Sequence, residues 1–180
     1  MPPLAAAVEG TRGTLVSVLE PGPHRVEPPC PHFGPDHENA RCGGCAVQHI
    51  ADDFYTDWKR DLVVAALASR GIETQVNPLI RAQLGERRRV IFAAIGHGTS
   101  VQLGFHRAGS HEIVAINECL IATPRIIAAL PLLTALASKA AVKAKTFQMA
   151  VLDTESGFDI AFDAPFTLAE PDRLRLVAAA

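Results

Sequence analysis

The residues of this sequence best suited to chemistry are its four cysteines. Cys30, Cys42 and Cys45 lie in one segment rich in glycine and proline, and Cys119 stands alone much further along the chain. Two glycines separate Cys42 from Cys45, and they allow the backbone to curl tightly enough for both sulfurs to face one point. Thiolates grouped in this way favour zinc or an iron–sulfur cluster.

Other interpretations of the cysteines stay open on spacing alone. Cys119 lies in the half-apolar run 116–122, where a buried thiol needs no ligand, so a partial site with an inert Cys119 is one alternative. Disulfides are another, although residues 1–10 lack the basic start and apolar run of a signal peptide. Zinc ribbons usually pair two short Cys-x2-Cys motifs, and only one is present. Three local cysteines and one remote cysteine are more typical of an iron–sulfur site.

Length and composition limit the class of protein. The chain has 180 residues, 48% of them hydrophobic, and a formal net charge of −2. This is enough for one domain with a real core, with at most a small appended module, and it argues against a uniformly basic nucleic-acid coat. No apolar run approaches the roughly 20 residues that a membrane helix needs. We therefore expect a cytoplasmic, monomeric protein without a membrane partner.

The elements around the cysteine segment can be predicted from local patterns. Residues 11–19 have the composition of a short β-strand, and the proline-rich residues that follow form a linker into the cysteine loop at 30–50. A metal would have to organise this loop. A helix follows, with Asp52 or Asp53 as its N-cap and Gly71 as its end. The aromatic residues of this helix, Tyr55 and Trp58, lie on its apolar stripe and are expected in the core.

The second part of the chain predicts a mainly antiparallel sheet. Strands are expected at 89–95, 101–106, 111–116, 147–152 and 158–162, a helix at 123–138 and a short final helix from 171. Cys119 would lie just beyond the end of the third of these strands. The predicted fold class is therefore α+β, with two or three helices and a cysteine-rich loop. The lone strand at 11–19 and the short uncapped helix at the other end make the chain look truncated at both ends.

Several motifs of this sequence, which follow one another in a fixed order, resemble the RNA uracil-5-methyltransferases, which methylate uridine in 23S ribosomal RNA and in transfer RNA with S-adenosylmethionine. These motifs are EPGPHRVEPPCPHFG at 20–34, CGGCAVQH at 42–49, the helix with Trp58 and Lys59, and GFHRAGSHEIVAINEC at 104–119, followed by Ala-Thr-Pro at 122–124. Together they cover roughly residues 11–130. The resemblance implies a [4Fe–4S] cluster held by Cys30, Cys42, Cys45 and Cys119.

The sequence departs from the family pattern within the cluster loop. Eleven residues separate Cys30 from Cys42, more than the family usually has, as though residues 35–40 were an insertion. A longer loop costs little entropy, so the site is loosened without being excluded, and His37 becomes a rival ligand. His49, beside the loop, is expected to be a structural hydrogen-bonding residue instead of a ligand.

The resemblance also implies a domain organisation. Residues 1–29 would be the remnant of a small β-barrel RNA-binding module, called TRAM, with its linker. Residues 30–50 would be the cluster loop, and 51–180 a central α+β domain. The family's catalytic domain carries a cysteine that attacks C6 of a flipped-out uridine before the methyl group is transferred to C5. No part of this sequence resembles that catalytic domain, so no catalytic residue is assigned. S-adenosylmethionine is expected only in the full-length enzyme, and this chain alone should be inactive.

The expected partner is RNA, ribosomal more than transfer RNA. The residues proposed to contact it are Arg87, Arg88 and Arg89, with His106 and Arg107 at the end of the paired strand, because clustered guanidiniums on a rigid element bind phosphates. The alternative is that the arginines form a solvated edge that guards against aggregation. Two rival functions remain, a non-catalytic zinc or iron–sulfur module that binds nucleic acid and an electron-transfer protein.

Overall fold

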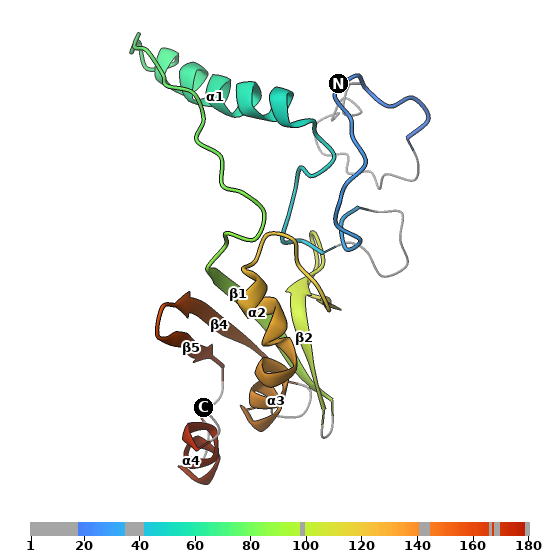
Figure 1. Cartoon of the computed structure of the whole chain (residues 1–180), viewed down its shortest axis with the longest axis vertical. Helices are drawn as coiled ribbons and strands as arrows, with labels where there is room; N and C mark the ends of the chain where they lie inside the picture. Colours follow the sequence, from blue (N-terminus) through green and yellow to red (C-terminus); the bar gives the residue numbers. More distant parts are fainter. Residues whose placement is uncertain are drawn as a thin grey trace.

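The core of the fold is a five-stranded antiparallel sheet. The computed structural model describes residues 18–34, 42–97, 100–140, 145–165, 167 and 170–178. The strands, in the spatial order β3-β2-β1-β4-β5, are β1 (Arg89–His97), β2 (Ser100–His106), β3 (Ile113–Ala115), β4 (Thr146–Thr154) and β5 (Gly157–Asp163). All neighbouring strands pair antiparallel, which confirms the predicted α+β class and the two hairpins. Figure 1 shows the central pair, β1 and β2, side by side.

Two helices cover one face of this sheet. They are α2 (Pro124–Ala128) and α3 (Leu130–Ala140), where the sequence predicted a single helix, and Ala129 separates them. Alternate residues of β4, among them Phe147, Met149 and Val151, point to the helices and are buried. The residues between them point to the opposite face, which none of the described helices covers.

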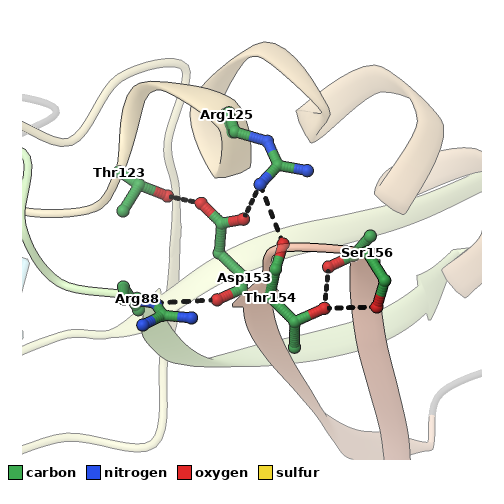
Figure 2. Close-up of polar contacts among 7 residues, drawn as sticks. Arg88, Thr123, Arg125, Asp153, Thr154 and Ser156 are labelled. Atoms are coloured by element: carbon green, nitrogen blue, oxygen red, sulfur yellow. Dashed lines mark hydrogen bonds and ion pairs between the residues drawn. The ribbon is translucent and has the colours of Figure 1, made fainter.

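A buried carboxylate ties the helix pair to the sheet (Figure 2). Asp153, at the end of β4, is only 5% exposed. Its carboxylate accepts a hydrogen bond of 2.7 Å from the hydroxyl of Thr123 and pairs with the guanidinium of Arg125 in the first turn of α2. Its backbone carbonyl accepts a hydrogen bond of 3.0 Å from Nε of Arg88. The start of β1, the end of β4 and the start of α2 are therefore held at one point.

The first helix lies apart from the sheet. This helix, α1 (Asp52–Ala68), begins after Ala51, which gives no side-chain cap, so the predicted aspartate N-cap is wrong. Asp52 and Asp53 lie instead in the first turn, where their charges favour the helix dipole. Gly71 ends the helix as predicted, at a φ of +70°.

The prediction that Tyr55 and Trp58 lie in the core is also wrong. No residue of α1 is buried, because the helix extends away from the sheet (Figure 1). The two rings contact each other and the cations of Arg81 and Lys59. Leu62 and Val63 are 47% and 49% exposed. Tyr55 therefore packs on the Arg81 cation, while Leu62 and Val63 remain about half exposed.

The two ends of the chain are described only in part. Of the strand predicted at 11–19, only Val18 and Leu19 are described, and they lie in no strand. The insertion at 35–40, with His37, lies outside the described residues. A short helix, α4 (Glu170–Val177), is found where the final helix was predicted. Among the described helices, none is both long and apolar enough to cross a membrane.

Candidate metal centre and its surroundings

The four cysteines converge although one of them is remote in sequence. Cys30, Cys42, Cys45 and Cys119 all line one narrow cavity of about 20 Å³ at the end of the sheet nearest α1. None of them forms a disulfide. Among the described residues, no group of three or more His, Cys, Asp or Glu side chains is placed to hold a single metal ion. The thiols thus share one cavity without meeting at one point.

Short backbone pairings bring the cysteine segments together. The N–H of Cys42 donates to the carbonyl of His32, and the N–H of Gly43 donates to the carbonyl of His106 at the end of β2. These bonds, of 2.9 and 2.8 Å, fix the Cys-Gly-Gly-Cys turn against the sheet. Gly43 has to be a glycine here, because a Cβ would lie 2.7 Å from the carbonyl oxygen of His106.

Cys119 is positioned by a separate pairing. Residues 85–87 run beside residues 120–123, with hydrogen bonds from the N–H of Gly85 to the Leu120 carbonyl and from the N–H of Arg87 to the Ile121 carbonyl. Because Arg87 leads directly into β1, this pairing holds Cys119 at the same end of the sheet as the cysteine turn.

The environment of the thiols is partly buried. Burial raises the pKa of the Cys30 and Cys42 thiols, and the neighbouring cysteines raise it further. The N–H of Gly44 lies 3.4 Å from Sγ of Cys42 and donates to it, which opposes this rise. A sulfur that already accepts a backbone hydrogen bond is a common feature of iron–sulfur ligands.

Polar residues that the sequence analysis did not single out surround the cavity. His32 lines it and contacts Oδ1 of Asn117 at 3.1 Å, which joins the segments of Cys30 and Cys119. Gln48 also lines the cavity, and its Oε1 is buried without a hydrogen-bond partner. His32 and Asn117 each lie two residues from a cysteine, and this spacing was the only signal for them in the sequence.

His49 is not among the residues that line the cavity. Its ring stacks on Phe33, with centroids 5.7 Å apart, and its carbonyl accepts a hydrogen bond from the N–H of Val26. Burial lowers the pKa of His49, and the charge of Arg25 adds to this effect. The hydrogen bond is made by the backbone, so the predicted role of the side chain stays a prediction.

The residues predicted to contact RNA lie at the same end of the sheet. The exposed Arg87, Arg88 and Arg89 lead into β1, and His106 and Arg107 end the adjacent β2. Cys42 forms a β-bridge with Arg107, so the cysteine turn contacts this basic region directly. Arg107 is partly neutralised by Glu112 at 3.0 Å. Arg88 is held by the Asp153 carbonyl, while Arg87 and Arg89 have no ion pair among the described residues.

Comparison with known proteins shows that this chain is similar to part of several bacterial RNA methyltransferases. An uncharacterized RNA methyltransferase of Rhizobium meliloti is 43% identical over 176 residues, which cover 98% of this chain and 42% of that protein. A second, from Agrobacterium fabrum, is 39% identical over 96% of this chain and 42% of its own length. The chain is homologous to part of these RNA methyltransferases. It spans about two fifths of the length of these curated relatives.

A more distant relative has a defined substrate in its name. The 23S rRNA (uracil(1939)-C(5))-methyltransferase of Dichelobacter nodosus is 36% identical over 119 residues, which cover 64% of this chain and 27% of that protein. The corresponding protein of a Marinomonas species is 33% identical over 62% of this chain. No family model matches the chain. The homology therefore extends to uracil-C5 methyltransferases of ribosomal RNA.

Proposed function

We propose that this chain is part of an S-adenosylmethionine-dependent RNA uracil-5-methyltransferase, in which it supplies a [4Fe–4S] site and an RNA-facing scaffold. The observation that carries the proposal is the shared cavity of Cys30, Cys42, Cys45 and Cys119 in a chain homologous to RNA methyltransferases. Ribosomal RNA is the preferred substrate because two relatives are named for methylation of 23S rRNA. The same proposal includes the division into a barrel remnant with its linker at 1–29, a cluster loop at 30–50 and a central domain at 51–180.

The donor set fits a cluster. All four cysteines offer sulfur and line one cavity. An iron–sulfur cluster is larger than one ion, so its ligands lie further apart. The narrow cavity needs to widen for a cluster, and rotation of the cysteine side chains about χ1 would allow this.

When bound, the cluster would supply a cross-link between the cysteine turn, the Cys30 segment and Cys119. Methyl transfer to uracil requires no electron from it, so a structural role fits the reaction. The chain's own residues would then hold RNA. Arg87, Arg88 and Arg89 would bind phosphates, and His106 and Arg107 would extend this surface along β2.

Salt-dependent RNA binding tests the RNA-facing role. Replacement of Arg87, Arg88 and Arg89 by glutamine should weaken binding of ribosomal RNA fragments to the cluster-reconstituted chain. It should also reduce the slope of log K against log salt concentration by about one for each lost phosphate contact. A matched control replaces three exposed cations away from this end, Arg70, Lys145 and Arg173, by glutamine. Equal losses in both variants would show that only overall charge matters and would reject the proposed surface.

A further inference from the structure

A second cavity lies on the helix-free face of the sheet, next to the cysteine turn. Its volume is about 160 Å³. The residues that line it are Gly43, Gly44, Ile91, Phe92, Ala93, Phe105, His106 and Gln148. It therefore brings together the two glycines between Cys42 and Cys45 and three adjacent strands of the sheet, β1, β2 and β4.

The walls of this cavity are apolar and open. Ile91 and Ala93 alternate with the core residues Val90 and Phe92, so they face away from the helices. Ile91 is 46% exposed in the central strand of the sheet. Its neighbours on this face include Ala93 and, on the paired strand β4, Ala150, so Ile91 stands above small side chains, where a flat apolar group can contact it.

Two polar side chains at the cavity are available to a ligand. Gln148 lies within β4, and its side-chain amide, which can both donate and accept, forms no hydrogen bond with any described residue. Nδ1 of His106 lies 3.2 Å from the carbonyl of His111. Because a carbonyl only accepts, Nδ1 carries the proton in this contact, and Nε2 is left for a ligand.

Size and charge narrow the class of ligand. The cavity is well below the roughly 300–1,000 Å³ of sites for larger ligands and cofactors, so it suits one small planar group. Arg89 lies on the same face as Ile91, two residues before it. Asp159 and Asp163 are exposed on β5, beyond β4, and would keep an anionic chain on the side of His106.

We propose that this cavity binds one unstacked base of single-stranded RNA. The base would stack on His106 and Ile91, Gln148 would hydrogen-bond its polar edge, and Arg89 would contact the adjacent phosphate. Proteins recognise unpaired bases on sheet surfaces by this combination of stacking and edge contacts. The inference rests on the proposed RNA-binding function and adds a base subsite to it.

The subsite also gives the cysteine site a role. Gly43 and Gly44 form one wall of the cavity, and their neighbours Cys42 and Cys45 line the proposed cluster cavity. Because the N–H of Gly43 is bonded to the His106 carbonyl, ligation of the two cysteines would fix this wall against the stacking residue. Loss of the cluster should therefore loosen base binding more than phosphate binding.

The test compares two probes, a short oligouridylate and a ribose-phosphate oligomer of equal length without bases. Fluorescence anisotropy measures their affinity for the cluster-reconstituted chain. The wild-type chain should prefer the oligouridylate by at least about fivefold, the lower limit of a stacked base. Ile91→Asp and Gln148→Leu should each reduce this preference severalfold. The control is Leu152→Asp, which adds the same charge to the same face, at a 36% exposed residue outside the cavity.

The outcomes separate this inference from the proposed function. Equal binding of both probes by the wild-type chain would overturn the base subsite and leave the phosphate surface standing. Failure of both probes to bind would reject both proposals. An unchanged preference in Gln148→Leu and Ile91→Asp, or an equal loss in Leu152→Asp, would also overturn the subsite. Gln148→Leu alters an exposed side chain, so it gives a result even where Ile91→Asp unfolds the chain.

Discussion

At one end of the sheet, the side chain of Asp153 and the four cysteines differ in how they hold the surrounding segments together. Asp153 is the only charged residue that is buried among the described residues, and both partners of its carboxylate come from the start of α2. The cysteines, by contrast, are only partly buried and bond mainly through the backbone of their segments. At the scale of residues, the carboxylate therefore fixes the core, while the thiols make few side-chain contacts of their own.

Removal of the Asp153 carboxylate should destabilise the chain. Asp153→Ala leaves the Thr123 hydroxyl and the Arg125 guanidinium without their partner, although Arg125 is half exposed and water compensates part of its loss. We expect a loss of about 2 kcal/mol in the free energy of unfolding, measured by urea denaturation. The control Asp159→Ala, at an exposed residue of β5, should change it by less than about 0.5 kcal/mol. Equal effects would show that the buried network contributes nothing.

His49 should make stability depend on pH. Because the folded state lowers the pKa of His49, the unfolded chain binds the proton more readily. The stabilisation from neutral His49 is complete above pH about 6.5, the ordinary pKa of histidine. It is lost as the pH falls below that value, through the lowered pKa of the folded state. The urea midpoint should therefore fall more steeply on acidification in the wild-type chain than in His49→Gln. Parallel pH profiles of the two proteins would contradict this assignment.

At the scale of elements, regular patterns predicted the sheet and missed what depends on distant contacts. The five strands follow alternating or β-rich stretches. These patterns depend only on which face of the strand is buried and on local residue preferences, so the strands were predicted correctly. The burial of α1 was predicted wrongly, because an apolar stripe indicates which side of a helix would be buried but not whether a partner covers it. The cysteines were found by residue type. Gln48 and Asn117 were not, although each lies within three residues of a cysteine, because their residue types did not indicate the contacts that they make there.

The docking of the cysteine turn on β2 should depend on Gly43. Gly43→Ala places a methyl group against the backbone carbonyl of His106, which cannot move without distorting the strand. We expect faster cleavage of the 30–50 region in limited proteolysis and a lower iron content. Ala46→Ser, an exposed position in the same turn, should behave like the wild-type chain. Unchanged protection in Gly43→Ala would mean that the turn is held elsewhere.

The stability of the described core should not depend on α1. Leu62→Lys with Val63→Lys changes two side chains that are about half exposed, so the free energy of unfolding should change by less than about 0.5 kcal/mol for each. Leu133→Ala, at a side chain only 1% exposed in α3, should cost about 2–5 kcal/mol. Urea denaturation distinguishes the two. A loss in the α1 variant as large as that of Leu133→Ala would place the helix in the core after all.

At the scale of the whole molecule, the chain is a five-stranded sheet with a basic, cysteine-bearing end. The basic residues, the shared cysteine cavity and the open cavity beside it all lie at this end, and α2 and α3 cover the other face of the sheet. Under the proposed function, this end of the sheet would face RNA. The chain spans about two fifths of the length of the curated relatives that it matches.

Metal analysis of the anaerobically purified chain tests the central claim most directly. The proposal predicts about four iron and four acid-labile sulfide per chain, with a broad absorbance near about 400 nm, and loss of both on Cys119→Ser as well as on Cys45→Ser. Stoichiometric zinc without sulfide would contradict it and favour a zinc module. Full iron content in Cys119→Ser would show that the fourth cysteine is not a ligand.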